Sequence, residues 1–298
     1  MESGALWGIA FGVLSCASYT AAAVAQRRLA VRVSEPLTHG GPLAALLRHP
    51  LWWVSLLFNG GRAGFQVAAV SHAPLTVVQP LGVLVLVFGV PWSARSEGRR
   101  VSAAEWRGVV LTSVALGVLL AVAVTGGGGG VLDDTASLVV GCGTTVLLAV
   151  TAWLSGRVRS VTWRSHLLAG AAGTALGVSS ATAKTSVAVI GESGATGLPH
   201  VSSLATPVIA VLGLFLAQAA YQGMELGAPL GVTTFANPLS AAVVGVVFMG
   251  ESYTGGRIGV LVATACALAA AYGIRLLTVP EAGKDGGTSR VRESGNVS

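Results

Sequence analysis

The sequence predicts an all-α, polytopic membrane protein whose nine transmembrane helices form an inverted repeat. Hydrophobic residues make up 53% of the 298-residue chain and charged residues only 10%, whereas an ordinary soluble domain carries about 25% charged residues. A helix needs about 20 apolar residues to cross the hydrocarbon core of a bilayer. The sequence offers nine such spans, at residues 6–25, 51–70, 75–93, 108–125, 136–154, 166–190, 202–222, 229–249 and 258–274.

Basic residues follow alternate spans. They are Arg27, Arg28, Arg32 and Arg48; Arg95, Arg99, Arg100 and Arg107; Arg157, Arg159 and Arg164; and Arg275, Lys284, Arg290 and Arg292. The opposite side receives Asp133, Asp134, Glu192 and Glu251, with Arg257 the one base near it. Since Lys and Arg mark cytoplasmic loops, we expect the amino terminus outside and the carboxyl terminus inside. The +6 net charge then reports topology and contact with lipid headgroups rather than nucleic-acid binding.

The first and sixth spans resemble one another. Residues 8–24 aligned without gaps on residues 173–189 match at eight of seventeen positions. Both segments contain Gly-x-x-x-Gly, at Gly8 and Gly12 and at Gly173 and Gly177. This pattern lets helix backbones approach closely in lipid. The two segments therefore begin two copies of one structural unit.

The third and eighth spans extend the repeat. "APLTVVQPLG" and "APLGVTTFANPL" each lead from Ala-Pro-Leu to a polar residue followed by proline, and an acid, Glu97 or Glu251, comes after each apolar run. Spans one to four and six to nine are the two copies, and the fifth span is the odd crossing that inverts them. Inverted copies that enclose a site near the bilayer midplane are typical of transporters.

The domain organisation follows from this repeat. Residues 1–125 form the first copy, 126–160 an outer glycine-rich linker with the fifth helix, and 161–280 the second copy. Residues 281–298 are polar and glycine-rich, which predicts a disordered cytoplasmic tail. Residues 42–47 are predicted to form a short interfacial helix.

Two basic residues lie inside predicted spans. Arg62 is midway along the second span and Lys184 is in the latter half of the sixth. A charge near the membrane centre costs roughly 2.5–3.5 kcal/mol on insertion scales, so such a group usually faces a cavity or a partner. The alternatives are that Lys184 snorkels to the surface and that Arg62 caps helix carbonyls. Two bases with no acid inside any span favour an anionic or zwitterionic substrate.

Further polar residues are candidates for substrate binding. Pro80 and Pro238 each leave a backbone carbonyl of the preceding turn without its helical hydrogen bond, and that carbonyl must find another partner or line a wet cavity. The alternative is that each proline only kinks its helix. Two glutamines, Gln66 and Gln218, and two tyrosines, Tyr19 and Tyr221, are expected either to bond a ligand or simply to link helices. The substrate-binding candidates are Arg62, Gln66, Gln79, Pro80, Lys184, Gln218, Tyr221, Asn237 and Pro238. Glu225, His72 and His200 are titratable groups near the membrane ends that could carry a proton.

The segments "WWVSLLFNGGRAGFQVAAVSHAPLTVVQPLGVLVLVFGV" and "FANPLSAAVVGVVFMGES" resemble the drug/metabolite transporter superfamily. The chain looks more like the nine-helix, NIPA-like magnesium transporter branch than like the EamA-like exporters. Residues 73–82 are the segment most specific to that branch. Gln218 with Tyr221, and Glu251, also fit. The resemblance implies a transporter of a small molecule or of Mg²⁺. Where that branch carries an acid late in the second span, this chain has Arg62 and Ala63, and Mg²⁺ usually needs carboxylates.

We therefore expect a secondary transporter in a cell membrane, with no cofactor and no catalytic residue. No phosphate-binding Gly-x-x-x-x-Gly-Lys-[Ser/Thr] loop occurs, which excludes that route to ATP. An intramembrane enzyme would need a nucleophile with a positioned base or a metal cluster, and no such motif appears. The sequence leaves three possibilities undecided: a non-transporting scaffold subunit, assembly as a homo-oligomer, and a metal site. The excess of Arg over Lys and of Ala, Gly and Val is typical of a GC-rich bacterial genome.

Overall fold

The described residues of the computed structural model form helices and no strand. They cover residues 2–32, 43–73, 79–96, 98–123, 130–250 and 256–278. The helices are α1 (Glu2–Arg32), α2 (Leu43–Arg48), α3 (Pro50–His72), η2 (Gln79–Val83), α5 (Leu84–Ser96), α6 (Ala103–Ala123), α7 (Asp134–Ser155), α8 (Val161–Ser193), η3 (Gly194–Gly197), α9 (Val201–Ala220), α10 (Gly227–Phe248) and α11 (Gly256–Thr278). Six of the described helices are long and apolar enough to cross a membrane: α1, α6, α7, α9, α10 and α11. The all-helical membrane class is therefore confirmed.

The remaining long helices carry the polar residues that the sequence singled out. α3 contains Asn59, Arg62 and Gln66, and α8 contains Lys184 among many Ser and Thr residues. α5 is shorter and apolar. The expected helix over 42–47 corresponds to α2 from Leu43, and residue 42 lies outside the described part. The glycine linker at 126–129, Glu97, Glu251 and the tail at 281–298 also lie outside it.

The third predicted span differs from a single helix. Residues 75–78 are not described; from Gln79 the chain forms the 3₁₀ helix η2 and only then the α-helix α5. Pro80 has no N–H to donate to an α-helical hydrogen bond, which agrees with a tighter opening turn. In the eighth span, by contrast, Asn237 and Pro238 lie inside the continuous helix α10. The two polar-proline pairs therefore stand in different local structures.

α1 packs against α3, η2, α5 and α9. α1 runs antiparallel to α3: a Cβ on Gly8 would clash with Ala73 near the end of α3, while Ser15 bonds the Arg62 carbonyl. α1 runs parallel to η2 and α5, because Cys16 Sγ donates to the Leu81 carbonyl and Thr20 Oγ1 to the Val85 carbonyl. Close backbone approach at glycine thus sets this packing.

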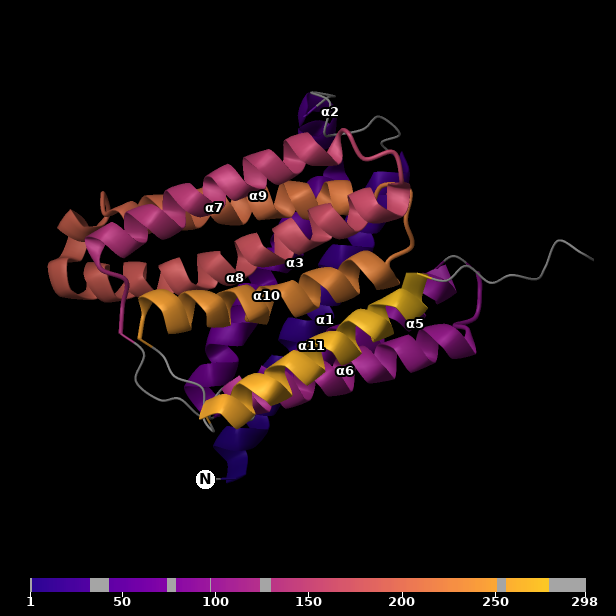
Figure 1. The fold of residues 1–298 in the computed structure, drawn as a ribbon, viewed down its shortest axis with the longest axis horizontal. Helices are drawn as coiled ribbons and strands as arrows, with labels where there is room; N and C mark the ends of the chain where they lie inside the picture. The colour runs from indigo at the N-terminus through magenta and orange to yellow at the C-terminus, as the bar shows by residue number, and fades with distance from the viewer. Residues whose placement is uncertain are drawn as a thin grey trace, which may run out of the picture.

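The same relations recur around α8. α8 runs antiparallel to α9, since Ser165 Oγ donates to the Ala220 carbonyl at 2.6 Å and Thr206 Oγ1 to Thr182 Oγ1 at 2.8 Å. α8 runs parallel to α10, where a Cβ on Gly173 would lie 2.6 Å from the Thr233 carbonyl oxygen. α8 lies between α9 and α10, and α7 packs against the α8–α9 pair (Figure 1).

α6 and α11 form a separate antiparallel pair (Figure 1). A Cβ on Gly108, near the start of α6, would lie 2.7 Å from the carbonyl oxygen of Gly273, near the end of α11. Further along, Leu116 and Leu119 of α6 share a buried apolar cluster with Cys266 of α11. The last helices of the two predicted copies are therefore in direct contact.

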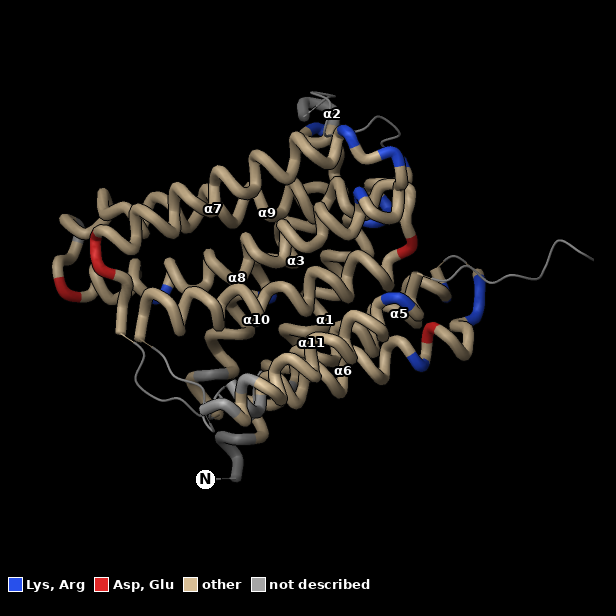
Figure 2. The backbone as a smooth tube through the Cα atoms, viewed as in Figure 1, with Lys and Arg blue, Asp and Glu red and all other residues tan. Residues whose placement is uncertain are grey.

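Basic residues gather at one end of the helices. Figure 2 shows most Lys and Arg near the end where α7 stops and α8 starts. Acidic residues stand at both ends: Asp133, Asp134 and Glu192 where α7 starts and α8 stops, and Glu105 and Glu225 among the basic residues, paired with Arg99. Where α7 starts, Asp133 caps this helix through the Ala136 N–H at 2.6 Å, and Asp134 lies 2.9 Å from His200 Nε2 at the start of α9. At the basic end Arg157 lies over the Trp153 ring. The concentration of basic residues expected from the sequence is present in space.

Candidate functional site

A polar cluster lies where α1, α3 and α10 meet. We define it by Ser15 and Tyr19 on α1, Arg62 and Gln66 on α3, and Thr234 on α10. Four of these five residues come from α1 and α3, whose antiparallel packing brings one turn of each helix together. The fifth comes from the second predicted copy. We call this group the central polar cluster.

Arg62 is held by contacts on two sides. Its guanidinium carbon lies 4.5 Å from the centre of the Tyr19 ring, a cation–π distance. Its backbone carbonyl accepts a hydrogen bond from Ser15 Oγ at 3.0 Å. Arg62 is half-buried and Tyr19 is 8% exposed. The Arg62 side chain therefore faces α1. Within the described part of the chain, it makes no hydrogen bond that caps a helix carbonyl.

Gln66 follows Arg62 by one helical turn, so both side chains share a face of α3. Its Oε1 lies 3.3 Å from Ser15 Oγ. Because one hydroxyl carries a single hydrogen, Ser15 donates fully to only one of its two acceptors at a time. Ser15 thus links the polar face of α3 to α1.

Thr234 brings the second predicted copy to this cluster. It is buried on α10 and lies near the Tyr19 phenol, although its Oγ1 makes no well-formed hydrogen bond with the described residues. Pro238, four residues later, lacks the N–H that would bond the Thr234 carbonyl. Thr234 therefore offers a hydroxyl and a freed carbonyl oxygen beside Tyr19. Sequence reasoning missed it, although its spacing from Pro238 was a usable signal.

Tyr221 lies beside this cluster. Its side chain is 2% exposed and shares an apolar cluster with Tyr19, Leu86 and Leu230. The two tyrosines are close enough to interact electrostatically. The structure therefore brings together two of the sequence candidates, Arg62 and Gln66, and places Tyr221 next to Tyr19.

Gln218 links helices instead. It is fully buried, and its Nε2 donates to the Gln26 carbonyl on α1 at 2.9 Å. Gln26 lies two turns beyond Tyr19, so this bond is remote from Arg62. The Gln218 Oε1 and Gln26 Nε2 atoms have no partner among the described residues. This amide pair ties α9 to α1.

The remaining candidates lie elsewhere. Lys184 is exposed on α8, away from Arg62 on α3. The Asn237 carbonyl accepts from Ser240 Oγ at 3.0 Å, where α8 packs on α10 at Gly177; Pro238 follows it in that helix. Gln79 and Pro80 belong to η2, and their side chains are outside the described part. Of the two basic candidates, Arg62 and Lys184, the central polar cluster contains Arg62.

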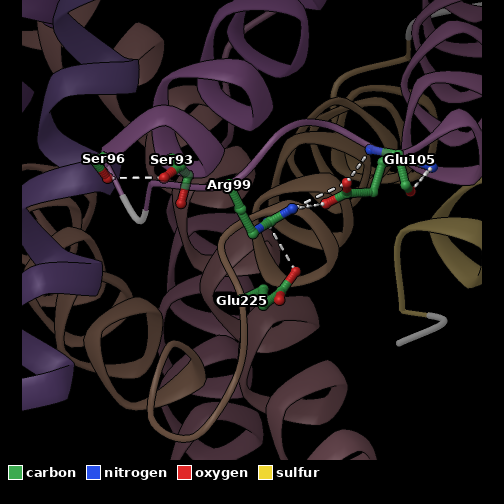
Figure 3. A network of polar contacts seen from close by, with 6 residues as sticks. Ser93, Ser96, Arg99, Glu105 and Glu225 are labelled. Atoms are coloured by element: carbon green, nitrogen blue, oxygen red, sulfur yellow. Dashed lines mark hydrogen bonds and ion pairs between the residues drawn. The ribbon is translucent and has the colours of Figure 1, made fainter. Parts of the chain in front are cut away.

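An ion-pair network stands at the basic end of the molecule (Figure 3). Arg99, in the loop between α5 and α6, pairs through Nη1 with Glu105 at 2.9 Å and through Nη2 with Glu225 at 2.9 Å. Glu105 begins α6, whereas Glu225 lies in the loop between α9 and α10. We call these three residues the Arg99 bridge. The bridge joins the two predicted copies and places Glu225 in an ion pair.

Metal ligands do not cluster in the described residues. No group of three or more His, Cys, Asp or Glu side chains is placed to hold an ion in that part of the chain. The described cysteines Cys16, Cys142 and Cys266 are unpaired thiols. Among its described residues, the central polar cluster therefore combines one cation, Arg62, with neutral hydroxyl and amide groups.

The chain is similar to an uncharacterized protein of Corynebacterium glutamicum. The two are 26% identical over 257 residues, which cover 85% of this chain and 88% of the relative. No protein-family profile and no solved structure matches the chain. The similarity therefore covers most of both chains, and the name of the relative states no activity.

Proposed function

We propose that the protein is a secondary active transporter that moves a small organic solute across a cell membrane by alternating access. The observation that carries the proposal is Arg62. A half-buried guanidinium midway along a helix, stacked on Tyr19 at 4.5 Å, is a costly group that membrane proteins usually keep for a substrate or ion pathway. The central polar cluster is then the substrate site.

The packing supports a nine-span inverted repeat. In each proposed copy the first helix, α1 or α8, runs antiparallel to the second and parallel to the third. The last helices, α6 and α11, lie antiparallel against one another, as partners related by an axis in the membrane plane would. Gly12 and Gly177, aligned by sequence, both approach the third helix of their copy closely, at Leu81 and Asn237.

The concentration of basic residues at one end supports a topology with that end in the cytoplasm. The amino terminus is then outside and the carboxyl terminus inside. A bacterial cell membrane is the proposed location, in agreement with the bacterial relative. Magnesium fits less well than an organic solute, because Arg62 would repel a bare cation and Mg²⁺ takes carboxylate ligands.

Transport by reconstituted protein tests the proposal. Proteoliposomes with an imposed pH gradient would be offered labelled benzoate, leucine, tetraphenylphosphonium and Mg²⁺. We expect uptake of an organic solute that Arg62→Ala abolishes while the protein stays inserted. The matched control is Arg157→Ala, which removes an exposed arginine that also lies over an aromatic ring, Trp153 at 3.3 Å. Full activity of Arg62→Ala would remove the central polar cluster from the pathway.

A further inference from the structure

The Arg62 guanidinium has no anionic partner in the described protein. The twelve Asp and Glu residues of the sequence all lie outside the predicted spans. Arg62 takes part in none of the ion pairs formed between described residues, such as those of Arg99 with Glu105 and Glu225 and of His200 with Asp134. The Tyr19 ring meets the charge only with its π-face. Within the described helices, the positive charge of the cluster is therefore uncompensated.

Hydrogen-bond donors surround this charge. An aromatic face offers no lone pair, so the five N–H donors of the guanidinium are left for other acceptors. Across the described helices, the one Arg62 hydrogen bond involving a side chain uses its backbone carbonyl. Thr234 Oγ1, buried on the facing helix, also has no partner there. A guanidinium whose N–H groups are available is complementary to an acceptor that carries negative charge.

We propose that the solute carries a single carboxylate and that Arg62 binds this group; the inference rests on the proposed transport function. The planar guanidinium matches a carboxylate with two parallel hydrogen bonds. One guanidinium balances one negative charge, so the bound pair is neutral inside the bilayer. A phosphate dianion or a dicarboxylate would leave a charge uncompensated at that depth, at a cost. The substrate class is thus organic monocarboxylates.

Matched acids and amides test this class by binding rather than by flux. The full chain, in nanodiscs of phosphatidylethanolamine and phosphatidylglycerol, would be titrated with acetate, hexanoate and benzoate and with acetamide, hexanamide and benzamide. We expect the acids to raise the unfolding temperature in a saturable way and the amides to leave it unchanged. Arg62→Gln should weaken acid binding about tenfold or more, because charge-assisted bonds are lost.

Two further variants keep the test decisive. Arg62→Lys keeps the charge but loses the planar fork, so acid binding should weaken several-fold even if Arg62→Gln does not fold. Arg157→Gln removes a surface arginine of equal charge and should bind acids as the wild type does. Equal shifts from acids and amides, no shift from any acid, or acid binding by Arg62→Lys equal to wild type would each overturn the inference.

The outcome separates this inference from the proposed function. Acid binding without uptake of any solute would uphold the carboxylate site and reject transport. Uptake of tetraphenylphosphonium with no acid binding would uphold transport and reject the carboxylate class.

Discussion

Gly177 marks the closest approach of α8 to α10. A Cβ there would clash with the Asn237 carbonyl and with Ser240 Oγ, whereas a Cβ on Gly191, on the same helix, meets nothing within 4 Å. We expect Gly177→Ala to lower the unfolding temperature in detergent by several degrees, because overpacking costs about 1–3 kcal/mol. Gly191→Ala should leave it unchanged or raise it slightly, since alanine favours helix. Equal shifts in the two variants would contradict this close contact.

Single residues differed in how well the sequence revealed them. Arg62 stood out because a charge interrupts an apolar run, and the structure places it against Tyr19. Thr234 did not, because threonine is common in such helices and only its position before Pro238 is unusual. Gln218 was ambiguous, and the structure shows a bond between helices. A polar residue's partner is set by helix packing, which the sequence does not state.

At the scale of elements, α6 begins with a reciprocal cap. Ser102 Oγ accepts from the Glu105 N–H at 3.1 Å, and Glu105 Oε2 accepts from the Ser102 N–H at 2.7 Å. This capping box satisfies two N–H groups that a helix start leaves without partners. We expect Ser102→Ala to lower the free energy of unfolding by about 1 kcal/mol.

Denaturant titration in detergent would measure the effect of this cap. The control is Ser160→Ala, because Ser160 caps α8 through a longer bond of 3.4 Å to the Trp163 N–H. We expect Ser160→Ala to lower the free energy of unfolding by less than Ser102→Ala does. A loss from Ser160→Ala as large as that from Ser102→Ala would show that the shorter Oγ bond of Ser102 gives no additional stability.

Hydropathy located the described helices but not their ends. The first span was predicted to stop at residue 25, whereas α1 continues to Arg32. The sixth was predicted from residue 166, whereas α8 starts after its cap Ser160. Apolar run length reports the hydrocarbon thickness, while a helix continues until its backbone bonds are capped. The 3₁₀ turn η2 was also missed, because hydropathy does not register the backbone effect of Pro80.

At the scale of the whole molecule, the sequence predicted the concentration of basic residues at one end, whereas the inverted repeat stays a prediction. The sequence did not predict which loops touch. Arg99 and Glu225 are 126 residues apart, and each looks like an ordinary loop charge in the sequence. Only the juxtaposition of the two proposed copies brings them into an ion pair. The Arg99 bridge is therefore a contact between the two proposed copies that the proposed motion has to break.

Alternating access requires the Arg99 bridge to open when the site faces the cytoplasm, because Arg99 and Glu225 belong to different copies. Glu225→Gln should therefore raise the cytoplasm-facing population. The side chains are 30% and 55% exposed, and exposed ion pairs contribute about 0.2–1 kcal/mol, so the shift is roughly 1.4- to fivefold. The reporter is Thr234→Cys in a background with Cys16→Ser, Cys142→Ala and Cys266→Ala.

A membrane-impermeant maleimide applied to inside-out vesicles would measure this shift as a faster labelling rate. Glu105→Gln is the matched control: it also removes a carboxylate from Arg99, but one within the first copy, at the start of α6. It should lower stability through the cap while leaving the labelling rate within about twofold of the parent, since no contact between copies is lost. If Glu225→Gln slowed labelling from this side, or if both variants accelerated it equally, the bridge would not hold the cytoplasmic side closed.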